Sequence, residues 1–346
     1  AGQLAMRGLA LASGTFADAR SGEMAPFVVA VQDSRSTPAG ARSALAATAG
    51  DDVIAVVGPI DGKSVDAAAA AADEMSVPLL SLNPRSGQRG EVSSRFVFHI
   101  VHSAEDRAVA LARHAYGLGV TSFAVLRPGN GYGRAVSGAF ADELARLGGD
   151  LVIEVTYDPK STSYTEVIDK LKKKQGWTAL FIPDQASRLE LIAPALAASD
   201  LISRPLDDDR RMRRGRKIAV LSTAEFIAPR YLRSAARYSY GAILAPGFFP
   251  DRADAQIGDF TGRYEQSFGT TPTALDAYSY DAALVVRSAA ADGASSRTAL
   301  AEVVAAGSVT GLTGTITFDE RRRRRDSGLL YQVIRDGADY AIRALR

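Results

Sequence analysis

The sequence predicts an α/β protein made of two lobes, each built on a parallel sheet. Short apolar runs rich in β-branched residues alternate with longer segments of helical period, which is the pattern of βαβ units. This alternation forms two similar blocks, and a mainly helical stretch follows Pro246. The 346 residues supply two or three domains at roughly 100 to 200 residues each. Two α/β blocks and a helical return to one of them indicate two lobes joined by more than one crossing.

The first block contains three expected strands and the helices around them. The strands are predicted at 27–31, 53–57 and 78–82, because each is a short apolar run and the second ends in the turn signal Gly58-Pro59. Helices are expected at 2–12, 38–49 and 64–75.

The second block repeats this rhythm. Its predicted strands are 122–126, 151–156, 179–182 and 218–221, and its predicted helices are 133–147, 164–174 and 186–198. Val136, Phe140 and Leu144 fall on one face of the first of these helices. The pair Gly148-Gly149 ends it, as a left-handed cap requires.

The pattern changes after Pro246. Gly247 to Pro250 interrupts the chain, and helices are expected at 253–268, 273–291 and 297–305. A closing strand pair is predicted from 315–318 and 329–334.

Composition excludes several classes of site. The chain has no cysteine, which removes disulfides, zinc thiolate sites, iron–sulfur clusters and cysteine nucleophiles. The 41 basic and 39 acidic side chains nearly balance, so charge points to no particular partner. No apolar run approaches the ~20 residues that span a bilayer. The first residues lack the build of a signal peptide, so we expect that none existed or that it has been removed.

Several segments together resemble the type I periplasmic solute-binding proteins, and most of all the leucine/isoleucine/valine-binding type that serves ABC importers. They are 56–59, 77–81, 95–100, 126–128, 131–133, 148–149, 260–264, 280–282 and 311–319. The resemblance implies two doubly wound parallel-sheet lobes, at 1–102 with 248–318 and at 103–247 with 319–346. It places three hinge crossings near 101–103, 246–250 and 318–320, with a ligand held between the lobes.

The resemblance also implies a set of ligand-binding residues. In the first lobe these are Gly62, Asn83 and Arg85, with Lys63 and Ser64 beside them, and they face the ligand carboxylate. In the second lobe they are Tyr132, Gln185 and Glu225, the last for the ligand ammonium. Because Arg85 could bind a carboxylate with two hydrogen bonds, an acidic or peptide-like ligand stays open beside a branched-chain amino acid. The expected protein is a non-enzymatic, cofactor-free receptor outside the cytoplasm that hands its solute to an ABC permease.

A second resemblance gives an alternative. Gly58-Pro59-Ile60, Ser64-Val65 and 79–83 also resemble the binding-protein-like domain of LpoA-type lipoproteins, which activate peptidoglycan synthases. The partner would then be a penicillin-binding protein, and a lipid anchor could precede the chain. In the solute-binding family a strand precedes the first helix, so we expect upstream residues to be absent from this sequence.

Other patterns favour structural roles. His99 and His102 have no evident third ligand, so no metal site is expected. The segment 129–133 is expected to be a turn, because it lacks the ending of a phosphate-binding loop. The charge runs 207–217 and 321–325 are expected to be solvated loops, with no nucleic-acid partner. Trp177 is expected to pack inside the protein.

Overall fold

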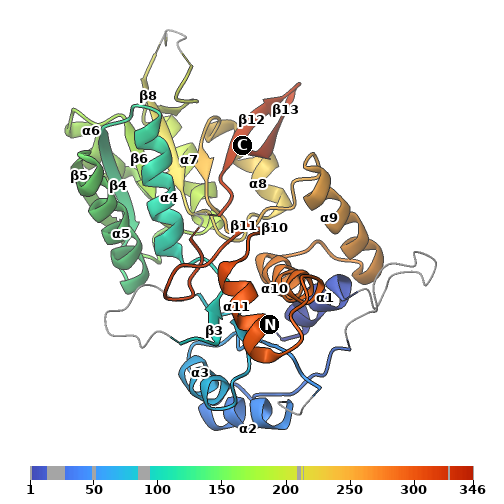
Figure 1. Cartoon of the computed structure of the whole chain (residues 1–346). Coiled ribbons are helices and arrows are strands. Elements are labelled where there is room, and N and C mark those ends of the chain that lie inside the picture. The colour runs from blue at the N-terminus through green and yellow to red at the C-terminus, as the bar shows by residue number, and fades with distance from the viewer. Residues whose placement is uncertain are drawn as a thin grey trace. The chain divides into compact units, whose positions relative to one another are not determined.

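The computed structural model describes residues 2–13, 28–48, 52–84, 94–208, 212, 214–325 and 328–345. The chain forms two compact units (Figure 1). Unit 1 comprises Ala1–Ser103 and Arg252–Asp326, and unit 2 comprises Ala104–Asp251 and Ser327–Arg346. The chain therefore passes from one unit to the other at three places. The lobe boundaries expected after 102, 247 and 318 stay a prediction.

Unit 2 is built on a sheet whose inner strands are parallel. In the described part of the chain its strands are β4 (Ser122–Pro128), β5 (Asp150–Tyr157), β6 (Ala179–Ile182), β7 (Leu201–Ser203), β8 (Arg216–Ser222), β9 (Ile243–Leu244), β12 (Tyr331–Asp336) and β13 (Asp339–Ala344). They lie in the order β13-β12-β9-β8-β6-β4-β5, and β7 pairs with β8. Only β12 pairs antiparallel, with β9 and β13.

Helices cover both faces of this sheet. Helices α4 (Ala104–Gly117) and α5 (Gly131–Leu147) pack on one face, where Phe140 stacks on Phe181 of β6 with ring centroids 4.1 Å apart. Helices α6 (Thr165–Lys173), α7 (Ala186–Ala198) and α8 (Pro229–Ser234), followed by the short η1 (Ala236–Tyr238), pack on the other. Trp177 is buried in this second layer and donates to the Leu171 carbonyl at 3.2 Å, so its packing role is confirmed.

Helix α5 shows how local sequence sets the element ends. It begins two residues earlier than predicted, because the Asn130 side chain caps it by accepting from the Gly133 N–H at 2.8 Å. It ends at Gly148, whose φ of 85° is the left-handed cap that the sequence indicated.

Unit 1 has a smaller parallel sheet in the order β1-β2-β3. These strands are β1 (Val56–Val57), β2 (Leu79–Ser81) and β3 (Val97–His99). The helices are α1 (Gly2–Ala12), α2 (Pro38–Thr48), α3 (Val65–Glu74), α9 (Ala255–Phe268), α10 (Ala274–Ala291) and α11 (Arg297–Ala306). Helices α2 and α3 pack on one face of the sheet, whereas α1, α10 and α11 pack on the other.

The first expected strand is wrong in the part that the structure describes. Residues 28–31 form no strand, while Phe27 lies outside the described residues. Val28 is 96% exposed, and β1, reduced to two residues, pairs with β2 alone in the described chain. A strand is stabilised by backbone hydrogen bonds to a neighbour, and residues 28–31 join no sheet of the described chain.

The predicted closing strand pair is also wrong. Strand β11 (Gly314–Ile316) pairs with β10 (Val309–Gly311) in unit 1, whereas β12 pairs with β13 and β9 in unit 2. Each local hairpin closes through a two-residue turn, which costs less chain entropy than pairing two segments across a longer loop.

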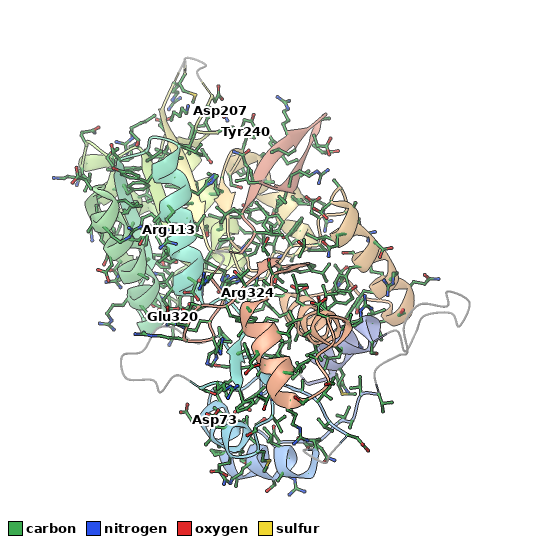
Figure 2. All side chains as sticks on the ribbon, viewed as in Figure 1. Asp73, Arg113, Asp207, Tyr240, Glu320 and Arg324 are labelled. Carbon is green, nitrogen blue, oxygen red and sulfur yellow. The ribbon has the colours of Figure 1, made fainter. Side chains whose placement is uncertain are left out.

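The arginine run is not the solvated loop that charge alone suggested. The His99 N–H donates to the Arg322 carbonyl at 2.8 Å, so the run extends the sheet beside β3. The Arg324 guanidinium (Figure 2) donates to the Thr313 hydroxyl at 2.9 Å and to the Ile100 carbonyl at 3.3 Å. In the other charge run, Arg216 opens β8 and lies 3.9 Å above the Trp177 ring. Both runs therefore contact neighbouring segments: the first through the Arg322 carbonyl and the Arg324 guanidinium, the second through the Arg216 guanidinium.

A fully buried carboxylate fixes the turn between β10 and β11. Asp281 of α10 accepts from the Leu312 N–H at 2.7 Å, and from the Thr313 N–H and hydroxyl at 2.9 and 2.6 Å. Burial raises the pKa of Asp281 to about 6, and the hydrogen bonds and Arg324 oppose that shift. The turn is thus held by a group that titrates near neutrality.

Glycine 311 should tolerate no side chain. A Cβ there would lie 2.6 Å from the Asp281 carboxyl carbon, which is packed on all sides. We expect Gly311→Ala to lower the free energy of unfolding by about 1–3 kcal/mol in urea titrations, since overpacking strains a closed core. Gly262→Ala on α9, where a Cβ meets nothing within 4 Å, should instead raise it by up to about 1 kcal/mol. Equal effects at the two sites would contradict this account.

Candidate functional site

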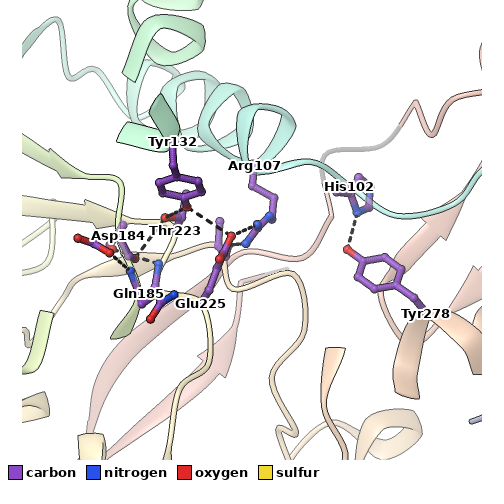
Figure 3. Close-up of polar contacts among 11 residues, drawn as sticks. His102, Arg107, Tyr132, Asp184, Gln185, Thr223, Glu225 and Tyr278 are labelled. Carbon is purple, nitrogen blue, oxygen red and sulfur yellow. Dashed lines mark hydrogen bonds and ion pairs between the residues drawn. The ribbon is translucent and has the colours of Figure 1, made fainter. Parts of the chain in front are cut away.

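Polar side chains gather in unit 2 beyond the carboxyl ends of three neighbouring parallel strands (Figure 3). Tyr132 lies in the first turn of α5, just after β4. Asp184 and Gln185 follow β6, while Thr223 and Glu225 follow β8. This edge of an open parallel sheet is where ligands bind in doubly wound folds.

Glu225 is the centre of this group. Its Oε1 accepts from the Arg107 guanidinium and from the Tyr132 hydroxyl, the latter at 3.4 Å. The Tyr132 hydroxyl also lies 3.3 Å from the Thr223 hydroxyl. The Arg107 and Glu225 side chains are only 9% and 19% exposed, so the ion pair is largely withdrawn from water. Arg107 also donates to the Ala245 carbonyl at 2.9 Å.

Tyr132 is a neutral hydrogen-bonding group at this site. Burial is the main cause that raises the pKa of Tyr132, and the negative charge of Glu225 raises it further. The phenol therefore keeps its proton at neutral pH, and it can donate to a carboxylate or accept from a donor on a ligand.

The backbone around Glu225 is strained. Ala224 and Phe226 have φ of 40° and 59°, in the left-handed region that residues with a Cβ rarely adopt, at a cost of about 1–3 kcal/mol each. The Glu225 carbonyl accepts from the Ala186 N–H at 2.9 Å, which ties this loop to the start of α7. Such strain persists only where surrounding contacts hold it, and here it fixes Glu225 beside Arg107.

Asp184 and Gln185 complete the edge. Asp184 accepts from the Gln185 N–H at 2.7 Å and from the Tyr157 hydroxyl. The Gln185 side chain is exposed and makes no capping bond to α7. Gln185 is thus placed at the expected edge with its amide available.

Unit 1 carries a second group at the start of α3. The Ser64 hydroxyl is fully buried and has no hydrogen-bond partner among the residues described. It occupies the N-cap of α3 without capping the helix, although its backbone N–H donates to Asp61 at 3.0 Å. The first N–H groups of a helix and its dipole favour an anion at this end.

Asn83 and Gly62 lie beside each other in unit 1. The Asn83 amide nitrogen donates to the Ile60 carbonyl at 2.7 Å and would lie 3.8 Å from a Cβ on Gly62. Asn83 thus holds the loop that leads to Ser64, whereas the Lys63 side chain is exposed. Arg85 lies outside the described residues.

The structure therefore brings together Gly62, Ser64 and Asn83 in unit 1, and Tyr132, Gln185 and Glu225 in unit 2. Sequence reasoning missed Arg107, Asp184 and Thr223. Asp184 and Thr223 follow β6 and β8, so the rule that sites lie beyond strand ends could have found them. Arg107 gave no such signal, because its partner is 118 residues away.

Other candidate features do not form a site in the described chain. The His102 ring nitrogen lies 3.0 Å from the Tyr278 hydroxyl, inside unit 1. No three His, Cys, Asp or Glu side chains of the described residues gather as metal ligands would. None of the helices described is both long enough and apolar enough to cross a bilayer.

Two units with parallel sheets, each with polar groups beyond its strand ends, define the class of two-domain solute-binding proteins. The chain belongs to the periplasmic binding protein family, whose model matches residues 2–338. This confirms the type I binding-protein fold that the sequence segments suggested.

Solved structures agree with this assignment. A protein from Rhodospirillum rubrum described as a branched-chain amino acid ABC transporter is 22% identical, with a TM-score of 0.81, and covers 99% of this chain and 95% of its own. The branched-chain amino acid substrate-binding protein LivJ of Streptococcus pneumoniae, in complex with isoleucine, is 20% identical, with a TM-score of 0.62 and coverage of 99% and 94%. A solute-binding protein of R. palustris in complex with benzoate is 15% identical, with a TM-score of 0.59 and coverage of 99% and 92%. No curated protein matches the chain.

Proposed function

We propose that this protein is an extracytoplasmic receptor that binds a small polar solute, an amino acid or a related carboxylate, for an ABC importer. Family membership supports the receptor role, and the described residues supply polar groups suited to binding. The observation that carries the proposal is the Ser64 hydroxyl, buried without a partner at the start of α3. A buried hydroxyl without a hydrogen bond costs about 1–3 kcal/mol, and a ligand carboxylate that reached it once the surrounding loop opened would supply the missing partner.

The two groups of residues suit different chemical groups of a ligand. Ser64 and the first N–H groups of α3 suit a carboxylate, with Lys63 adding positive charge nearby. Tyr132, Gln185 and the cluster around Glu225 suit an amino, hydroxyl or amide group.

Thermal melting with a panel of solutes tests this function. A solute present at 100 times its dissociation constant should stabilise the fold by about 2.7 kcal/mol, and so raise the melting temperature. The panel contains the twenty amino acids, their 2-hydroxy acid counterparts, benzoate and short peptides. If the folded protein responds to none of them, the receptor role for this solute class is wrong, and the LpoA-type interaction domain becomes the better interpretation.

Tyr132 provides the matching variant test. We expect Tyr132→Ala to abolish the ligand-induced shift in melting temperature, because it removes both the ring and the hydroxyl from the cluster. Tyr132→Phe keeps the ring and should weaken binding roughly tenfold, the effect of one hydrogen bond to a charged network. Calorimetric titration measures both, and the melting temperature without ligand verifies folding. An unchanged shift in Tyr132→Ala would remove Tyr132 from the site.

A further inference from the structure

Three charged side chains act on the Tyr132 hydroxyl. Glu225 and Asp184 raise the pKa of Tyr132 by their negative charge, and Arg107 lowers it. Arg107 and Glu225 form a mostly buried ion pair, so their charges cancel locally. Asp184 is then the remaining negative charge that acts on Tyr132.

Among the described residues, Asp184 accepts hydrogen bonds from uncharged donors, and the positive charge of Arg188 acts on one of them, the Tyr157 hydroxyl. The other donor is the Gln185 N–H. Burial and the nearby Asp184 charge raise the pKa of Tyr157, so this donor keeps its proton at neutral pH. The nearest cation along the chain, Arg188 one turn later, donates instead to the Ser161 carbonyl at 3.1 Å and to the Pro159 carbonyl. A carboxylate has about four acceptor positions, so Asp184 can accept further donors.

Glu225 is poorly suited to bind a cation alone. A ligand ammonium at Glu225 would approach the Arg107 guanidinium, and the repulsion would offset the attraction in this half-buried setting. The Asp184 carboxylate accepts from uncharged donors, so an ammonium bound there does not compete with a guanidinium hydrogen bond. The strain at Ala224 and Phe226 and the bond from Arg107 to Ala245 both keep the Arg107–Glu225 pair together.

We infer that Asp184, rather than Glu225, is the residue that selects a guest with a positively charged nitrogen, and that the Arg107–Glu225 pair orients Tyr132. This inference rests on the proposed function and narrows its ligand class. Carboxylates with a protonated amine bind better than amine-free carboxylates such as hydroxy acids or benzoate.

The test compares matched ligands on matched variants. Wild type, Asp184→Asn and the control Asp169→Asn, an exposed acid on α6, are titrated calorimetrically with the amino acid that gives the largest melting shift and with its 2-hydroxy acid. In wild type, the amino acid should bind at least tenfold more tightly than the hydroxy acid. Asp184→Asn should weaken the amino acid roughly 10- to 100-fold and the hydroxy acid less than about threefold, because only the charge-assisted contact is lost. Asp169→Asn should match wild type.

The outcomes separate the inference from the proposed function. If wild type binds hydroxy acids or benzoate as tightly as amino acids, the inference is wrong although the receptor role stands. Equal losses for both ligands in Asp184→Asn would show a structural role only, and unchanged binding would exclude Asp184 as the selecting residue. If Asp184→Asn fails to fold, Glu225→Gln decides the question, because this variant should keep the preference for the amino acid over the hydroxy acid. No binding by any solute of the panel would overturn the proposed function itself.

Discussion

Replacing Arg107 with methionine is expected to lower the free energy of unfolding by about 2–4 kcal/mol. Methionine fills much of the same volume, but it leaves the Glu225 carboxylate without its guanidinium partner in a site where little water can compensate. Removal of one partner from a fully buried pair costs about 3–5 kcal/mol, and the partial exposure of Glu225 reduces that range. Equilibrium unfolding in urea, monitored by circular dichroism, measures the change.

Two further variants make this prediction specific. Arg214 pairs with Asp200 in the same unit, but these side chains are 86% and 40% exposed, so Arg214→Met should change stability by less than about 1 kcal/mol. Adding Glu225→Gln to Arg107→Met should recover a large part of the loss, since it removes the unpaired charge. If Arg107→Met and Arg214→Met lower the free energy of unfolding equally, the buried Arg107–Glu225 pair stabilises the protein no more than an exposed pair does.

The second large effect is a pH dependence that comes from Asp281. Its pKa is about 6 in the folded protein against an ordinary 3.8, so the folded state binds the proton more tightly than the unfolded chain does. The stabilising contribution is therefore complete below about pH 3.8 and is lost as the pH rises through 6. At 1.36 kcal/mol per pKa unit the full effect is roughly 3 kcal/mol, of which about 2 kcal/mol falls between pH 4.5 and 7.5.

Asp281→Asn should remove this component. The asparagine cannot titrate, so the free energy of unfolding of wild type should fall relative to that of the variant by about 2 kcal/mol from pH 4.5 to 7.5. Comparing the two proteins at each pH cancels the titration of all other groups. The variant also loses one acceptor for the Leu312 and Thr313 N–H groups, which shifts its stability at every pH without changing the slope. Parallel curves for the two proteins would show that Asp281 is ionised throughout this range.

Local patterns predicted the elements of unit 2 well because those elements depend on nearby residues. Strand β6 and helix α7 have the predicted bounds, since a short apolar run with clear ends and a helical period specify them locally. Whether β1 and residues 28–31 form full strands depends on neighbouring strands that are distant in sequence. The apolar character of these residues could not show which neighbouring strands the described chain provides. The predicted pairing of 315–318 with 329–334 was wrong for a related reason, because these two segments lie in different units.

The candidate site was predictable in part. The resemblance placed Tyr132, Gln185 and Glu225 on one edge of a sheet, and the structure places them there. It could not show that Glu225 already has a cationic partner, because a helix position such as that of Arg107 says nothing about a loop 118 residues later. The charge balance at a site depends on which residues the fold brings together. The inference that Asp184 rather than Glu225 selects the ligand nitrogen depends on that balance.

The contacts of the arginine run 321–325 beside β3 also affect how readily a protease cleaves the native protein there. Enzymes that cleave after arginine bind an accessible, locally extended peptide and prefer exposed loop tips. In the run, the Arg322 carbonyl accepts from His99 and the Arg325 N–H donates to the Thr317 carbonyl at 2.9 Å. The four arginine–arginine bonds of 321–325 are therefore sheltered as long as this edge of unit 1 stays folded, and digestion within 321–325 reports the opening of that edge.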